Sequence, residues 1–205
     1  MNNDMDIPSL LRDIKRELRL AMNGIASARM RESGMNYKLI FGVELPRLQQ
    51  IAAEFPVNHE LAQALWKENV RECNILAGLL QPVDTFYPEI ADIWVESIRV
   101  PELAQLTVMN LFARLPYAAD CAFRWMADER DMFQLCGFLL TARLLMQGAV
   151  LNEQAENEFL DQASSALQSP FLPVRQAARA ALQKFMESNE SAFQKGQQAA
   201  GISPE

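Results

Sequence analysis

Apolar residues recur every three or four positions along most of the chain, and strict alternation of apolar and polar residues is hard to find. This spacing places the apolar side chains of an α-helix on one face. We expect short helices over residues 7–28, 44–55, 58–69, 71–80, 87–99, 101–115, 117–128, 131–147, 152–168 and 171–187. The predicted fold class is therefore all-α.

The connections between the predicted helices are short, and most prolines lie at or near them, where a missing backbone N–H costs little. Residues 132–148 are apolar on nearly every side up to Arg143, which indicates a helix packed between neighbours. In residues 170–185 a proline-started helix carries small side chains such as Ala177 and Ala181, which let neighbouring helices approach closely. These features predict an α-α superhelix, or solenoid, of HEAT-like or ARM-like antiparallel helix pairs.

The domain organisation follows from the same pattern. We expect one HEAT-like repeat domain over residues 1–187. Residues 188–205 are polar and small, so we expect a weakly ordered tail with one or two helical turns at most.

The formal net charge is −7, opposite in sign to that of a general phosphate-binding protein. Residues 1–50 nevertheless hold 8 Lys and Arg against 6 Asp and Glu, which leaves room for a local basic face. The three cysteines lie far apart without CxxC spacing and are typical of buried apolar positions in a reduced compartment. No apolar leader or membrane-spanning stretch is evident, so we expect a cytoplasmic protein without membrane contact.

Common catalytic and cofactor motifs are missing from the sequence. His59 is the only histidine, which removes triads and multi-histidine metal sites, and neither GxGxxG nor GxxxxGK[ST] occurs. Acidic clusters are better explained as solvated helix ends. We therefore expect no metal and no cofactor.

Two consecutive segments, residues 34–55 and 59–80, carry a set of landmarks in a specific order. The landmarks are Tyr37, Phe41-Gly42-Val43, Pro46, Leu65-Trp66, and Glu72 ahead of Ile75-Leu76-Ala77. In order and residue type they resemble the DNA alkylation repair family, the AlkD-like HEAT-repeat DNA glycosylases. The resemblance extends helix by helix over about residues 10–187.

For active members of that family, the resemblance implies a concave basic groove that holds alkylated DNA. A carboxylate, assisted by tryptophans and an arginine, promotes loss of a cationic N-alkylated purine. The anionic group stabilises positive charge developing on the sugar, and aromatic faces favour the cationic lesion.

The positions of this chain that match the family's functional residues are altered. The family's Trp-Asp pair and its second Asp fall on Pro101, Glu102 and Gln105, so the catalytic carboxylate position holds a neutral amide. The two arginines of the family's Trp-x-Arg-Arg run fall on Gln134 and Leu135, and its late tryptophan falls on Ala180. Glu102 is the only nearby carboxylate candidate for a surviving activity.

Three functional hypotheses remain open from the sequence. We favour a non-catalytic HEAT-like module that contacts duplex or damaged DNA, or a protein, through its concave surface. There are two alternatives. One is an active glycosylase that uses Glu102 to excise N-alkylated purines, and the other is a pure protein-binding scaffold. The candidate contact residues recur in the later helices: Arg114, Arg143, Arg175 and Arg179.

Overall fold

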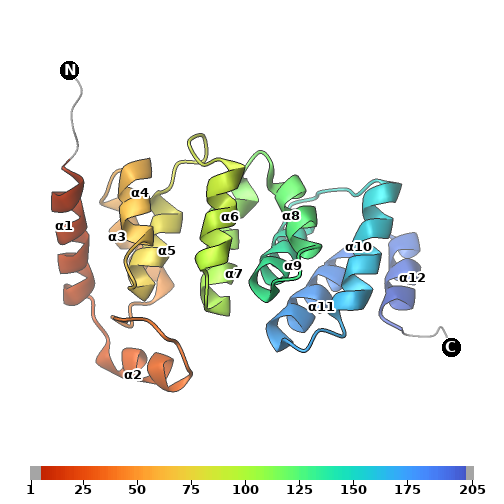
Figure 1. The fold of residues 1–205 in the computed structure, drawn as a ribbon, viewed down its shortest axis with the longest axis horizontal. Coiled ribbons are helices and arrows are strands. Elements are labelled where there is room, and N and C mark those ends of the chain that lie inside the picture. Colours follow the sequence, from red (N-terminus) through yellow and green to blue (C-terminus); the bar gives the residue numbers. More distant parts are fainter. Residues whose placement is uncertain (1–5, 202–205) are drawn as a thin grey trace. The chain divides into compact units, whose positions relative to one another are not determined.

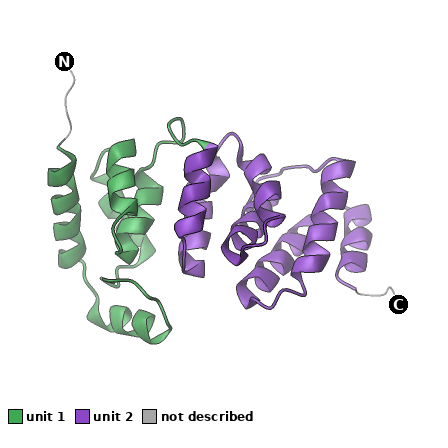
Figure 2. Cartoon of the chain, viewed as in Figure 1, with its two compact units in different colours: residues 1–87 green, residues 88–205 purple. Residues whose placement is uncertain are grey.

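The computed structural model describes residues 6–201 of the 205-residue chain. These residues are helical apart from turns, loops and one isolated parallel bridge between Leu39 and Val70. The chain divides into two compact units, residues 1–87 and residues 88–205 (Figures 1 and 2). The boundary lies inside the region expected to form one domain, and the single-domain hypothesis stays a prediction.

Unit 1 contains five helices within its described residues, and α4 packs on both α1 and α5 while α3 packs on α5. Apolar residues such as Ile14, Leu48 and Leu65 are fully buried between them. The helices are α1 (Ile7–Leu20), α2 (Gly24–Glu32), α3 (Leu45–Ala53), α4 (His59–Trp66) and α5 (Arg71–Leu80).

The prediction of a single helix over residues 7–28 is wrong, because α1 and α2 both occupy this stretch. α1 ends at Leu20, and the side chain of Asn23 accepts a hydrogen bond from the backbone N–H of Ala26 at 3.0 Å. An asparagine at this position satisfies one of the free N–H groups of a new helix. The Asn23-Gly24 step therefore starts α2.

A buried ion pair holds the segment after α2 against α5. The Glu72 carboxylate is fully buried and accepts hydrogen bonds from the backbone N–H groups of Phe41 and Gly42, both at 2.9 Å, and of Val43 at 3.3 Å. Arg71 donates from Nη1 to Glu72 Oε1 at 2.9 Å and to the carbonyl of Val43 at 3.1 Å. The family landmark at Glu72 is thus a structural anchor for residues 41–43.

Unit 2 is built from stacked helix pairs. Consecutive helices pack together in the pairs α8–α9 and α10–α11. Helix α9 also packs on both α7 and α11. The helices are α6 (Pro88–Ser97), α7 (Pro101–Asn110), α8 (Ala118–Met126), α9 (Asp131–Met146), α10 (Glu153–Ala166), α11 (Leu172–Met186) and α12 (Glu190–Ala199). A single 3-10 turn, Phe112–Arg114, replaces the end of the helix expected over 101–115.

The central position of α9, expected from its apolar sequence, is confirmed because α9 packs against α6, α7, α8 and α11. Gly137 allows α9 to pack closely on α8, because a Cβ atom there would lie 2.5 Å from the backbone nitrogen of Met126 on α8. No helix of the described residues is both long and apolar enough to cross a bilayer.

The segment after residue 188 differs from the expected polar tail. Residues Glu190–Ala199 form α12, which packs on α10 and α11. Asn189 caps this helix through a hydrogen bond from the Ala192 N–H at 2.9 Å, and Ala192 and Gly196 are buried. Ala192 and Gly196 are one turn apart on the same face, and their small size lets α12 pack closely on its neighbours although the segment is polar overall.

Candidate functional site

Five of the positions identified by the family resemblance lie on two helices of unit 2 that pack together: Pro101, Glu102 and Gln105 on α7, and Gln134 and Leu135 on α9. Glu102 lies in the first turn of α7 and is half-buried, whereas Gln105 is exposed one turn later. On α9, Gln134 is half-buried, and its amide donates to the Asp128 carbonyl at 2.7 Å. Leu135 is 3% exposed, so this position belongs to the core and cannot contact a ligand.

A cavity of about 420 Å³ lies next to these helices, at the N-terminal end of α9. Its residues come from α6 and the turn after it, from the start of α9, and from the start of α11. The cavity is lined by Val95, Glu96, Arg99, Arg130, Asp131, Met132, Phe133 and Phe171. None of Pro101, Glu102, Gln105 or Ala180 lines it.

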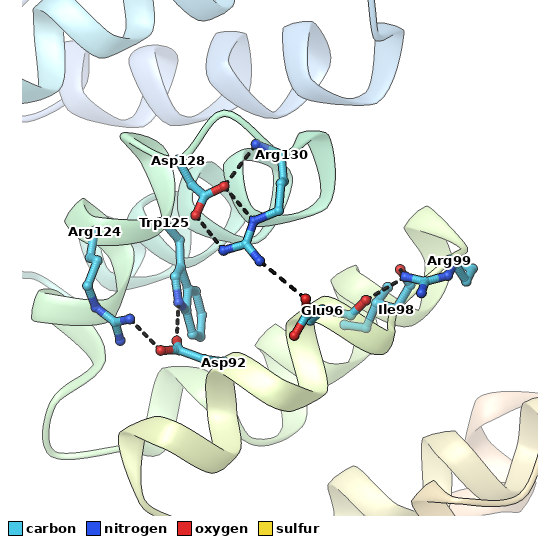
Figure 3. A network of polar contacts seen from close by, with 8 residues as sticks. All are labelled: Asp92, Glu96, Ile98, Arg99, Arg124, Trp125, Asp128 and Arg130. Atoms are coloured by element: carbon cyan, nitrogen blue, oxygen red, sulfur yellow. Dashed lines mark hydrogen bonds and ion pairs between the residues drawn. The ribbon is translucent and has the colours of Figure 1, made fainter.

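Arg130 is the most firmly held cation of the cavity. Its Nε and Nη2 donate to the two oxygens of Asp128 at 2.8 and 2.7 Å, and its backbone N–H donates to the same carboxylate at 2.9 Å (Figure 3). Glu96 lies 3.6 Å away, and the guanidinium carbon lies 3.6 Å from the centroid of the Phe133 ring. A guanidinium fixed on an aromatic face in this way is preorganised to bind a planar or anionic group.

The pKa values of this pair shift in opposite directions. The hydrogen bond to Asp128 raises the pKa of Arg130, and the hydrogen bonds from Arg130 lower the pKa of Asp128, against a smaller opposing effect of desolvation. Both groups therefore stay ionised over the whole physiological range.

Arg99 brings a second cation to the cavity from the end of α6. Its Nη1 donates to the backbone carbonyls of Glu96 and Ile98 (Figure 3). A cation at a helix C-terminus is favoured there by the exposed carbonyl groups. Two arginines and two aromatic rings thus meet two carboxylates, Glu96 and Asp131, in one cavity.

The two tryptophans of this unit are structural. Trp94 and Trp125 are each 1% exposed, so neither offers a face to a ligand. Asp92 accepts a hydrogen bond from the Trp125 indole N–H at 2.7 Å and is also bound by Arg124 (Figure 3). The hydrogen bond to Asp92 raises the pKa of Arg124.

The four arginines predicted as contacts lie at different places in unit 2, and none lines the cavity. Arg114, in the 3-10 turn, donates to the Asn110 carbonyl at 3.2 Å, and Arg143 is half-buried near the end of α9 with a buried Nε. Arg175 caps the turn before α11 by donating to the Ser169 carbonyl at 2.6 Å. Arg179 follows on α11 one turn later and is exposed, so only these last two share a helix face.

The cavity arginines were missed by the sequence analysis, and so was Phe171. The Asp128-x-Arg130 spacing just before a helix is a local signal for the ion pair. Arg99 had only a weak signal, a cation directly after a helix, and no local pattern marks Phe171.

Two other expectations about chemistry concern cysteines and metals. Burial raises the pKa of the Cys73 thiol to about 12 and also raises those of Cys121 and Cys136, so all three stay protonated. Within residues 6–201, no group of three or more His, Cys, Asp or Glu side chains is placed to hold a metal ion.

A solved structure shares this fold with a TM-score of 0.82 over 97% of this chain and 83% of the other chain, at 17% sequence identity. It is described as "A new family of proteins related to the HEAT-like repeat DNA glycosylases with affinity for branched DNA structures". The class is therefore that of HEAT-like helical repeat proteins, which confirms the predicted fold.

Residues 14–195 match the profile of the family described as DNA alkylation repair enzyme. The chain belongs to this family, as the resemblance of its N-terminal landmarks implied. No curated protein matches the chain significantly.

Proposed function

We propose that this protein is a non-catalytic DNA-binding member of its family and that it prefers branched DNA. The proposed contact in unit 2 lies along the predicted concave surface of α7, α9 and α11, with the cavity at one end. Its affinity for branched DNA is proposed by analogy with the structurally similar protein, whose description includes that affinity.

The observation that carries the proposal is the chemistry of positions 105, 134 and 180. They hold two amides and one methyl group, and the side chains at 105 and 180 are exposed. An amide cannot supply the full negative charge that stabilises an oxocarbenium-like transition state. Loss of such a carboxylate raises the activation free energy by several kcal/mol. Binding without excision is the activity that these residues support.

The cavity supports contact with a nucleotide. Arg130 and Arg99 provide cationic groups for a phosphate, and the half-buried Phe171 provides an apolar ring for a base or sugar. Residues 88–205 hold nine basic and fifteen acidic residues, a net charge of −6, so attraction to DNA has to be local in this unit.

The test is a fluorescence anisotropy titration of the purified chain with a four-way junction and with a linear duplex of the same arm sequence, at two salt concentrations. We expect tighter binding to the junction, weakening with salt by about 0.9 in log-log slope for each phosphate neutralised. An alkaline-cleavage assay on duplex containing 7-methylguanine accompanies it, with wild type, Glu102→Gln and Gln105→Asp. We expect no excision by any of them, because Gln105→Asp restores the carboxylate without its aromatic and arginine supports.

Each outcome selects one hypothesis. Excision by the wild type that Glu102→Gln abolishes would establish the glycosylase alternative with Glu102 as its carboxylate. No binding to either DNA at low salt would leave the protein-binding scaffold. Equal affinity for junction and duplex would overturn the preference for branched DNA.

A further inference from the structure

The helix α2 buries less of itself than any other helix of unit 1. Ser27 is its only buried residue, and α2 packs extensively on none of the other described helices. In Figure 1 it lies apart from α3, α4 and α5, at one end of the unit. Hydrophobic packing therefore contributes little to holding it in place.

Polar backbone contacts fix α2 instead. The Asn23 N–H donates to the Phe41 carbonyl at 2.9 Å, and the Ser27 hydroxyl donates to the Ile40 carbonyl at 2.7 Å. Gly42 has φ 75°, and a Cβ there would lie 2.3 Å from the Asn23 carbonyl oxygen. Because Glu72 and Arg71 anchor residues 41–43, α2 is an exposed helix with a fixed position.

The exposed side chains around α2 combine apolar and cationic groups. Leu20 is 75% exposed, Met22 60% and Ile25 71%. Arg19, Arg29 and Arg31 are exposed and form no ion pair within the described residues, while Glu32 is the one acidic residue in this stretch. We call these exposed residues around α2 the α2 surface: Arg19, Leu20, Met22, Ile25, Arg29 and Arg31. Within it, Ile25 and Arg29 share one face of α2, and Arg31 lies on another side of the helix.

Two of the other three cations of α1 are neutralised, whereas Arg12 is exposed and forms no ion pair among the described residues. Lys15 pairs with Glu68 at 2.7 Å, and Arg16 pairs with Asp13 at 2.9 Å. The unpaired cations of residues 6–32 are therefore Arg12 and the three arginines of the α2 surface, in a unit of ten basic and eleven acidic residues.

We infer that the α2 surface is a second DNA contact, which binds the branch point of a junction. Its arginines match backbone phosphates, and its apolar side chains match base pairs exposed where a duplex opens. A continuous duplex offers the phosphates but requires unstacking before apolar side chains can contact base faces. The arginines thus contribute affinity for any duplex, and the apolar residues contribute the preference for a branch. This inference rests on the proposed DNA-binding function.

The test compares matched variants of the full chain in the anisotropy assay. Arg29→Glu with Arg31→Glu is set against Arg47→Glu with Lys67→Glu, exposed cations of the same unit that give the same change in net charge. We expect the first pair to weaken binding to both DNAs about tenfold or more and to lower the salt slope, and the control pair to change it about twofold or less. Circular dichroism verifies that each variant keeps its helix content.

A second pair tests the apolar part. Ile25→Ser is set against Val57→Ser, whose side chain is 62% exposed elsewhere in unit 1. We expect Ile25→Ser to lower the ratio of junction to duplex affinity, with duplex affinity unchanged, and Val57→Ser to leave the ratio as in the wild type.

The outcomes separate this inference from the proposed function. If the wild type binds junctions but the Arg29/Arg31 variant behaves like its control, only the inference is overturned. If the wild type binds no DNA, both are overturned. If the Arg29/Arg31 variant loses as much affinity for poly-glutamate as for DNA, and Ile25→Ser leaves the junction preference intact, the surface is a site for acidic partners and not for a branch point.

Discussion

Glu72 in unit 1 and Asp128 in unit 2 each bind an arginine, yet the two pairs differ in their surroundings. Glu72 is fully buried and accepts three backbone N–H groups, whereas the Asp128–Arg130 pair lies at the surface beside a cavity. A buried charge left without its partner is costly, while an exposed pair contributes little to stability. The difference indicates that Glu72 maintains the fold and that the Asp128–Arg130 pair is available to a ligand.

The largest effect is expected for Glu72→Gln. The neutral amide has one carbonyl oxygen for the three N–H donors and leaves Arg71 as a buried charge, so unfolding should require about 3–5 kcal/mol less free energy. Urea denaturation followed by circular dichroism measures this. Hydrogen exchange at Phe41, Gly42 and Val43 should accelerate in parallel.

Glu60→Gln is the matched control, because Glu60 is exposed in the first turn of α4. The urea midpoint of Glu60→Gln should stay close to that of the wild type. Equal midpoints for the two variants would show that the buried carboxylate is not an anchor.

Gly42→Ala is expected to have the next largest effect. Its positive φ and the close approach of Asn23 and Ser27 both oppose a Cβ atom, so we expect a loss of about 2 kcal/mol or more. Gly34→Ala is the control with φ 91° and open space around the added methyl, and should cost about 1 kcal/mol. Hydrogen exchange should accelerate in α2 only for Gly42→Ala; similar rates in both variants would argue that α2 is held in some other way.

Asp128→Asn should have the smallest effect on stability, and this effect should depend on pH. Because the folded-state pKa of Asp128 is lowered, its stabilisation is fully present above the unfolded pKa of about 3.9 and is lost as pH falls through the lower folded pKa. We expect the variant to melt about 2 °C or less below the wild type at neutral pH. The difference should shrink at acidic pH in a thermal melt series, and a difference that grows there would contradict the assigned ion pair.

The helical architecture was predictable because periodicity is a local property of the sequence. The same property concealed the break between α1 and α2, since Ala21 and Met22 continue the apolar pattern. The Asn23-Gly24 cap was the signal that could have revealed it. For α12, buried Ala192 and Gly196 gave too weak an apolar pattern to predict a packed helix.

The candidate site was less predictable because it is tertiary. Its cavity joins residues 95–99, 130–133 and 171, which no local spacing relates. Leu135 illustrates the converse problem: it lies in a stretch apolar on nearly all sides, and only the packing of α9 identifies it as core. The resemblance marked positions of the family's chemistry but could not indicate which side chains of this chain occupy the cavity.

Four of the helices in residues 6–201 begin at an asparagine whose side-chain carbonyl accepts a backbone N–H at 2.8–3.0 Å: α2, α4, α10 and α12. A neutral amide does not attract counterions, so added salt does not screen these caps as it screens ion pairs. The hydrogen bonds that cap these helices should therefore persist at salt concentrations that release DNA. Dissociation on raising salt can then be attributed to the lost phosphate contacts and not to fraying of the helices.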